Sequence, residues 1–200
     1  MPAALFSKGV SIAWAIVCTA GTLAEIRSAA EQISSIKSDF IQEKQMAILA
    51  HPIIARGYFA YQRPASLRWE YRQPLHSVLL LHDGKAHRFV QSDGGWIEDK
   101  AANTQSMDFI LQEISKWLQG RFDDNPMFRV SVEDGNRIIM TPKDKSMDQF
   151  IQRIELIMAD QPGIMKEVVI YESTDSFTRF IFIDPKINEP IAPAEFQKVQ

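Results

Sequence analysis

Most of the chain consists of short runs in which apolar and polar residues alternate, with turn residues between one run and the next. In SLRWEYRQ, residues 66–73, Leu67, Trp69 and Tyr71 share one side while charged residues occupy the other. A period of two is typical of half-buried strands. About six such runs precede a long helical pattern and about five follow it. Because the connections are short, the sequence predicts one antiparallel sheet in meander order, which at this size should curl toward a barrel.

Turn residues mark the ends of these runs. Asp83-Gly84 is a hairpin signal, because this pair accepts the positive φ angles of a type I′ turn. Residues 92–95 (SDGG) give a second hairpin signal, and Gly135-Asn136 and residues 161–163 (QPG) separate later runs. These signals predict neighbouring strands joined by tight turns.

Two segments break the period of two. Residues 25–36 (EIRSAAEQISSI) and 104–119 (TQSMDFILQEISKWLQ) repeat apolar residues every three or four positions, which is typical of amphipathic helices. Gly120 follows the second segment as a plausible helix stop. Two such helices over one sheet face predict a mainly β fold with helices (α+β), an unclosed antiparallel β-barrel, or half-barrel, covered by a helical lid.

The first 24 residues read as a secretory signal peptide. Lys8 is their only charge, and it is followed by a short apolar run and then by small residues. We expect cleavage after Ala24, with Ala20 as the second choice; an uncleaved anchor or a buried helix is the alternative. Residues 25–200 then form one exported domain. Cys18 is the only cysteine. It leaves with the signal peptide unless it is lipidated, in which case it would anchor the protein.

The composition and motifs argue against several classes of function. With 46% hydrophobic and 24% charged residues the chain is typical of a soluble globular protein, and a net charge of −3 makes nucleic acid an unexpected partner. The four histidines lack metal-ligand spacing, and no nucleophile or phosphate-binding motif occurs. The adjacent acids Asp123-Asp124 and Glu133-Asp134 are more typical of solvated loops, although the fold could assemble a carboxylate pair from distant positions. The sequence therefore predicts no enzyme, no catalytic residue, no cofactor and no metal.

Large apolar side chains are the most conspicuous feature that the strands and helices carry. The face with Trp69 and Tyr71 and the helical stripe with Met107 and Trp117 could enclose a cavity of aromatic and flexible groups, a type that binds apolar ligands. The alternative is that the same side chains form a dry core. The expected lipid-binding residues are Phe40, Tyr58, Leu67, Trp69, Tyr71, Leu79, Leu81, Met107, Ile110, Leu111, Ile114, Trp117 and Leu118.

Residues 61–85, YQRPASLRWEYRQPLHSVLLLHDGK, resemble the outer-membrane lipoprotein carrier family (LolA-like) in their Arg-Pro, Trp, Gln-Pro and Asp-Gly-Lys landmarks. The segments SSIKSDFIQEKQ, RIIMTPK and FTRFIFIDPKINEPIAPAEFQ are similar to further segments of that family, in the same order. The resemblance covers nearly all of the chain after the signal peptide. The sequence differs from the family at Leu67, where an aromatic residue is frequent at a membrane-transfer contact, and in a shorter tail after Phe196.

The resemblance implies an unclosed barrel with a helical lid that works in the periplasm. Such a carrier shields the acyl chains of lipoproteins, or of a related lipid, and delivers them to the outer membrane. The implied partners are acylated lipoproteins or lipid cargo, an inner-membrane releasing transporter and an outer-membrane acceptor; we expect a monomer. Arg63 occupies the position of the arginine that latches the lid through backbone carbonyls, and five fixed donors suit that role. The alternative is a periplasmic or anchored binding module for another apolar ligand, such as a glycolipid or pigment precursor.

Overall fold

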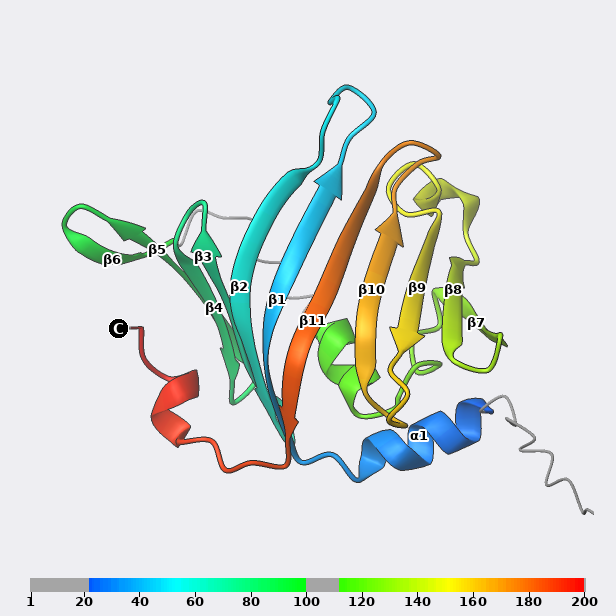
Figure 1. The fold of residues 1–200 in the computed structure, drawn as a ribbon, viewed down its shortest axis with the longest axis horizontal. Coiled ribbons are helices and arrows are strands. Elements are labelled where there is room, and N and C mark those ends of the chain that lie inside the picture. The colour runs from blue at the N-terminus through cyan, green and yellow to red at the C-terminus, as the bar shows by residue number, and fades with distance from the viewer. Residues whose placement is uncertain (1–21, 100–111, 200) are drawn as a thin grey trace, which may run out of the picture.

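The computed structural model describes residues 22–99 and 112–199, and in these residues eleven strands form one antiparallel sheet (Figure 1). The strands are β1 (Ser35–Gln45), β2 (Ile53–Gln62), β3 (Ser66–Gln73), β4 (Ser77–His82), β5 (Lys85–Ser92), β6 (Gly95–Glu98), β7 (Phe128–Glu133), β8 (Arg137–Pro142), β9 (Arg153–Met158), β10 (Met165–Tyr171) and β11 (Phe177–Ile187). Their order across the sheet is β6-β5-β4-β3-β2-β1-β11-β10-β9-β8-β7. The predicted meanders of about six and about five strands are confirmed.

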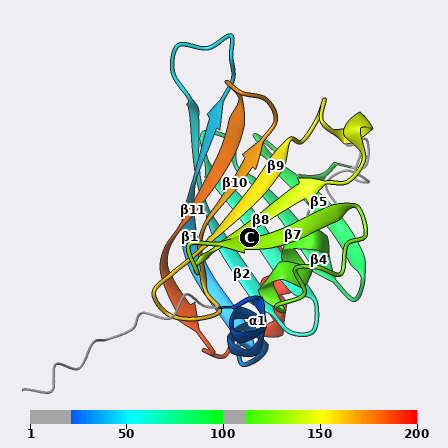
Figure 2. The same cartoon turned by 90° about the vertical axis from the view of Figure 1, so that its right-hand side faces the viewer.

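The two meanders meet where the first and last strands pair. β1 and β11 have 11 residues each and pair from Ile36↔Ile187 to Gln45↔Phe177. β6 and β7 are the outer strands and do not pair with each other, so the sheet curves without closing (Figures 1 and 2). The predicted unclosed antiparallel barrel is therefore confirmed.

Helix α1 (Leu23–Glu31) crosses one end of the sheet, below the β9–β10 connection in Figure 1. The Thr22 side chain and the Glu25 carboxylate form a reciprocal capping box that fixes its start. A Cβ atom on Gly163, in the β9–β10 connection, would lie 2.6 Å from the Ala30 nitrogen, so the helix and the turn pack in close contact. The sequence predicts a helix over residues 25–36, but the observed helix ends at Glu31. Strand β1 begins at Ser35, so Ile36, the last apolar residue of the predicted stripe, belongs to the sheet.

The second predicted helix is described from residue 112 onward. Residues 112–118 are helical, and we call them the lid segment. The segment ends at Gly120, whose φ of 78° is the left-handed conformation of a helix stop. The Arg27 Nε donates to the Gly120 carbonyl at 3.1 Å, which joins α1 to the end of the lid segment. The expected residues Met107, Ile110 and Leu111 lie outside the described residues.

The tight turns follow the sequence closely. Asp83 and Gly84 have φ of 49° and 72° between β4 and β5, as the Asp-Gly signal predicts. Between β7 and β8 the positive φ angles fall at Asp134 and Gly135 rather than at Gly135-Asn136. Of the described helices, none has the length and apolar character needed to cross a membrane.

The convex face of the sheet is covered in part by the C-terminal segment, which includes the short 3-10 helix η2 (Pro193–Phe196). The Arg68 Nη1 donates to the carbonyls of Glu195 at 3.1 Å and Lys198 at 2.9 Å. Phe196 is buried beneath this segment with Ala60 and Ile191. The C-terminal segment therefore packs on one face, which leaves the concave face to the helices.

Candidate ligand-binding site

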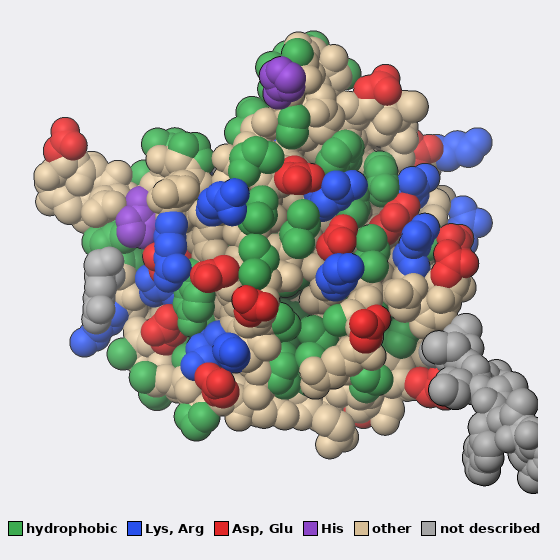
Figure 3. All heavy atoms as spheres, in the orientation of Figure 1, with side chains coloured by type: hydrophobic (Ala, Val, Ile, Leu, Met, Phe, Trp, Pro, Cys, Tyr) green, Lys and Arg blue, Asp and Glu red, His purple; other side chains and the backbone are tan. Residues whose placement is uncertain are grey.

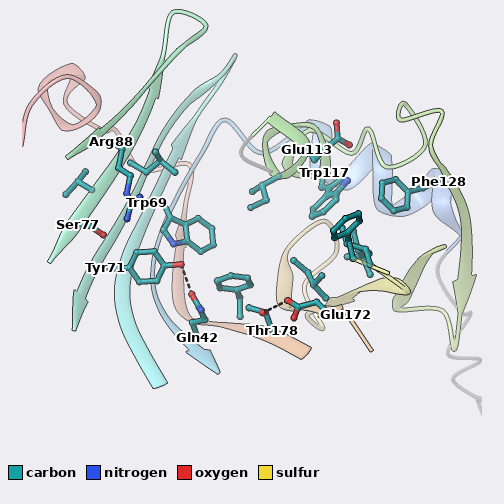
Figure 4. A pocket seen from close by; sticks show the side chains of 18 residues that line it. Gln42, Trp69, Tyr71, Ser77, Arg88, Glu113, Trp117, Phe128, Glu172 and Thr178 are labelled. Atoms are coloured by element: carbon teal, nitrogen blue, oxygen red, sulfur yellow. Dashed lines mark hydrogen bonds between the residues drawn. The ribbon is translucent and has the colours of Figure 1, made fainter. Parts of the chain in front are cut away.

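A cavity of about 360 Å³ lies between the concave face of the sheet and the lid segment (Figure 4). Its wall combines residues from both meanders with three from the lid segment. The lining residues are Gln42, Trp69, Tyr71, Ser77, Val78, Leu79, Arg88, Glu113, Ile114, Trp117, Phe128, Phe150, Ile151, Ile154, Ile170, Glu172, Thr178 and Phe180. Most of these side chains are aromatic or aliphatic, and the volume lies within the usual range of ligand sites, about 300–1,000 Å³.

An aromatic cluster from β1, β3 and β11 supports one side of the wall, where Trp69 and Phe180 reach the cavity and Phe40 lies behind them. The Trp69 ring lies 4.7 Å from the Phe40 ring and 5.1 Å from that of Phe180, centroid to centroid. Phe40 can lie over β2 because its partner there is Gly57: a Cβ atom at that position would approach the Phe40 ring to 2.5 Å and the Glu70 carbonyl to 2.1 Å. The absence of a side chain at Gly57 therefore allows the aromatic cluster to form.

Polar groups occupy the end of the cavity away from the lid segment. The Tyr71 hydroxyl donates to the Gln42 Oε1 at 2.5 Å, and burial raises the pKa of Tyr71 to about 12, so the phenol stays neutral. The Lys44 ammonium is paired with the Glu172 carboxylate, which also accepts from the Thr178 hydroxyl at 3.1 Å. The wall is thus polar at this end, and Ser77 of β4 and Arg88 of β5 add polar groups on another side (Figure 4).

The lid segment brings further polar atoms to the wall. The Glu113 Oε1 accepts from the Lys116 Nζ at 2.7 Å. Its Oε2 and the indole N–H of Trp117 are buried and have no hydrogen-bond partner among the described residues. Buried polar atoms are normally paired, so these two could pair with polar atoms of a ligand.

Ten of the expected lipid-binding residues are described: five line the cavity, four lie in the core around it, and Tyr58 lies elsewhere. Trp69, Tyr71, Leu79, Ile114 and Trp117 line the cavity. The residues Phe40, Leu67, Leu81 and Leu118 are buried in the surrounding core and do not reach its surface.

Tyr58 lies on the opposite face of the sheet, which corrects the expectation that it faces the cavity. Its ring packs with the C-terminal cluster and carries the Arg72 guanidinium 5.0 Å from its centroid. Burial, and then the Glu195 carboxylate, raise its pKa to about 12. The sequence ARGYFAYQ has aromatic residues on both sides of the strand, so alternation alone did not decide which side faces inward.

Sequence reasoning missed the wall contributed by the second meander. That wall includes Phe128, Ile154, Ile170 and Phe180 from four different strands. The alternation of these strands predicts that one of their faces is buried. It does not predict that this face lies opposite the first meander, because that arrangement depends on the curl of the sheet. Phe150 lies in a loop and is 67% exposed although it lines the cavity, and no periodic signal could identify it.

Arg63 lies between the two helical elements. Its Nη2 donates to the carbonyl of Ala30, in the last turn of α1, at 3.0 Å, and its Nε donates to the carbonyl of Ile33, just after the helix, at 2.7 Å. The carbonyl of the next residue, Pro64, accepts from the Gln119 side chain at 3.1 Å, just after the lid segment. The Arg63-Pro64 corner therefore contacts both elements that cover this end of the cavity.

A second hollow of about 320 Å³ lies between β4–β5 and the C-terminal segment. It includes His82, which bonds Ser66 at 2.8 Å, and His87, which bonds Glu98 at 2.7 Å. Among the described residues no group of three histidine, cysteine or acidic side chains could hold a metal ion. Asp123 pairs with Arg27 and Asp124 with Arg121, so this acidic pair takes part in ion pairs at the loop.

An unclosed antiparallel barrel that holds an apolar cavity beneath a helical segment defines a protein built to bind an apolar ligand. The family model described as outer membrane lipoprotein carrier protein LolA matches residues 31–199. The chain therefore belongs to the LolA family, as the sequence resemblance indicates. Members of this family are lipoprotein- or lipid-binding carriers of the periplasm, and the family is one of binding and transport proteins rather than enzymes.

Individual relatives are distant. An outer-membrane lipoprotein carrier protein from Nitrosomonas europaea is 27% identical, with 72% of this chain and 68% of the relative covered. A solved structure of an uncharacterized conserved protein from Thermus thermophilus has a TM-score of 0.53 at 8% identity and covers 88% of this chain and 93% of its own. It shows a shared fold alone. A LolA superfamily protein from Nitrosomonas europaea has a TM-score of 0.43 at 11% identity, covering 88% and 98%.

Proposed function

We propose that this protein is a periplasmic carrier that shields the acyl chains of lipoproteins, or of a related lipid, and delivers them to the outer membrane. The observation that carries the proposal is the cavity of about 360 Å³, walled by aromatic and aliphatic side chains, in a member of the LolA family. Each CH₂ moved out of water gains roughly 0.8 kcal/mol, so an acyl chain needs such a shelter between two membranes. A monomer would receive cargo from an inner-membrane releasing transporter and pass it to an outer-membrane acceptor.

Analysis of the co-purifying ligand tests this function. The protein is purified without detergent and extracted with organic solvent, and mass spectrometry should find acyl chains. Ile170→Arg, which places a charge in the half-buried wall, should lose them, whereas Ile97→Arg on exposed β6 should retain them. Absence of acyl chains from the wild type, together with no binding of a fluorescent fatty acid, would contradict the proposal.

We propose that Arg63 latches the helical cover. The hydrogen bonds to the carbonyl of Ala30 in α1 and to that of Ile33 just after it, together with the Pro64–Gln119 contact, support this role. We expect Arg63→Leu to leave the fold intact and to alter the rate of cargo loading or release, with the exposed Arg56→Leu as the matched control. If Arg63 is merely a surface residue before a turn, its loss should cost under about 0.5 kcal/mol and leave transfer unchanged.

We also propose export with removal of the N-terminal segment. The capping box changes the preferred cleavage position, because cleavage after Ala24 would remove the Thr22 cap and the first two residues of α1. Loss of such a cap costs about 1 kcal/mol. Cleavage after Ala20 keeps the whole box. The intact mass of the exported protein should therefore place its N-terminus at Gly21; a start at Glu25 or a lipidated Cys18 would contradict this position.

A second candidate ligand is an apolar molecule with polar groups, such as a glycolipid or pigment precursor. Gln42, Arg88, Glu113 and Glu172 in the cavity wall favour it over a plain acyl chain. The same extraction separates the two candidates, because the mass of the bound molecule identifies its class.

A further inference from the structure

The hairpin that joins β1 to β2 projects beyond the neighbouring strand ends (Figures 1 and 2). We call residues 46–54 (MAILAHPII) the hairpin tip. The tip has no lysine, arginine, aspartate or glutamate. Ile48 is 84% exposed, Ile53 50% and Ile54 41%, which are large values for isoleucine. Figure 3 shows hydrophobic side chains and a histidine on this end of the molecule. Exposed apolar patches of this kind mark surfaces that meet a partner or a membrane.

Apolar side chains lie on both faces of the tip. Ile53 pairs with Lys44, and Ile54 pairs with Glu43, so these two neighbours point to opposite sides of the hairpin. A groove on a protein partner would cover one face and leave the other in water. A medium that surrounds the tip would cover both faces, which favours the interior of a lipid interface as the occupant.

Several backbone groups of the tip are already hydrogen-bonded within the protein. The Gln45 Nε2 donates to the carbonyls of Met46 and Leu49, each at 3.0 Å, and the Leu49 N–H donates to the Met46 carbonyl at 2.9 Å. The Ala47 N–H donates to the Ser176 hydroxyl at 3.1 Å. These bonds pair backbone groups that would otherwise need water, and unpaired groups are what prevents irregular backbone from entering lipid.

The tip is continuous with the polar end of the cavity. β1 carries Gln42, a lining residue, only a few positions before the tip. Ser176, which contacts the tip, lies in the turn between β10 and β11, close in the chain to the lining residues Glu172 and Thr178. A tip set into a bilayer would therefore hold this rim of the cavity against the lipid surface.

We propose that the hairpin tip inserts into the surface of a phospholipid membrane. The proposal goes beyond the carrier function and does not depend on which ligand fills the cavity. The driving force is the burial of exposed isoleucine side chains, with the paired backbone lowering the cost of entry.

Vesicles of phosphatidylethanolamine and phosphatidylglycerol test the proposal by flotation. We expect wild-type protein to bind, and Ile48→Ser/Ile53→Ser to lower the partition coefficient at least about tenfold. Leu75→Ser/Ile97→Ser is the matched control, because both residues are exposed isoleucine-sized side chains outside the tip. It should bind as the wild type does. Far-ultraviolet circular dichroism and the unfolding midpoint show that each variant is folded.

A fluorescent probe shows where the contact occurs. Ile48→Cys and Ile97→Cys, each made in the protein that starts at Gly21 and so lacks Cys18, carry an environment-sensitive label. On addition of vesicles the emission of the label at position 48 should shift to the blue and be quenched by brominated phospholipid, with no change at position 97. Insertion driven by apolar burial should persist in high salt.

Several results would overturn the proposal. They are a wild type that does not bind vesicles, equal binding by the tip variant, and binding that disappears in high salt. A blue shift at position 48 that depends on protein concentration and needs no vesicles would instead identify a second copy of the chain as the occupant. Either way the carrier function is tested separately by the extracted ligand, so the two can fail independently.

Discussion

Alternate residues of strand β3 form its two faces, and these faces differ in what covers them. On the convex face the guanidinium of Arg68 and the carboxylate of Glu70 lie 2.7 Å apart, and Arg68 also holds the C-terminal segment. On the concave face Trp69 and Tyr71 line a cavity. The convex side is thus completed in part by the chain's own C-terminus. The concave side keeps an apolar volume, and this difference indicates that its remaining partner is a ligand.

The largest expected loss of stability comes from removing Arg68 on the convex face. Arg68→Leu should lower the free energy of unfolding by about 3 kcal/mol, at the low end for a broken buried ion pair, because Glu70 would keep only Arg72 and His76 as partners and two C-terminal carbonyls would lose their donor. Urea unfolding measures this loss. Arg56→Leu, at an exposed position of β2 outside this ion-pair network, is the control and should cost less than about 1 kcal/mol. Equal losses of stability in both variants would show that the buried Arg68 contributes no more than an exposed arginine does.

A smaller effect is expected from the concave side, together with a change in ligand. Ile114→Ala should lower the free energy of unfolding by about 2 kcal/mol, at the low end for such a truncation, because the side chain already borders empty volume. The larger cavity should admit bulkier cargo, which mass spectrometry of the extracted ligand measures.

Leu118→Ala is the matched control for Ile114→Ala. Leu118 lies one turn further along the lid segment and is buried without lining the cavity. Its truncation should cost stability and leave the ligand profile unchanged. If both variants change the ligand in the same way, the lid segment acts on the cavity through its general packing rather than through its lining side chain.

The sequence predicted the sheet well because its signals are local. Alternation and the Asp83-Gly84 turn place the strands and their connections, and each hairpin follows from residues close together in the chain. The limits of helices were harder to predict. Ile33 and Ile36 fit a helical stripe, yet Ile36 pairs with Tyr61 in the sheet, because a position can satisfy both periods.

The sequence predicted only part of the cavity wall, because which faces meet is not a local property. Trp69 and Trp117 were identifiable as large apolar residues on inner faces. Tyr58 was misplaced because its strand is aromatic on both sides, and the charged residue Glu172 was missed because only the curled sheet brings β10 and β11 opposite the first meander. Which inner face meets which is a property of the whole sheet and has no local signal.

The smallest effect concerns pH and the convex side alone. Burial acts to raise the pKa of Glu70, but hydrogen bonds from Arg68 and His76 and the charge of Arg68 outweigh it and hold the pKa below its ordinary value of 4.5. Because the pKa of Glu70 is lower in the folded state, its ionised carboxylate stabilises the fold at pH values above 4.5. This contribution is lost as the pH falls through the folded-state pKa. The difference in unfolding free energy between wild type and Glu70→Gln should therefore be larger near neutral pH than at about pH 3. Urea unfolding at both pH values measures it, with the exposed Glu133→Gln as control. A difference that stays constant would show that Glu70 acts through its shape and packing, and that the ion pair with Arg68 contributes little to the convex face.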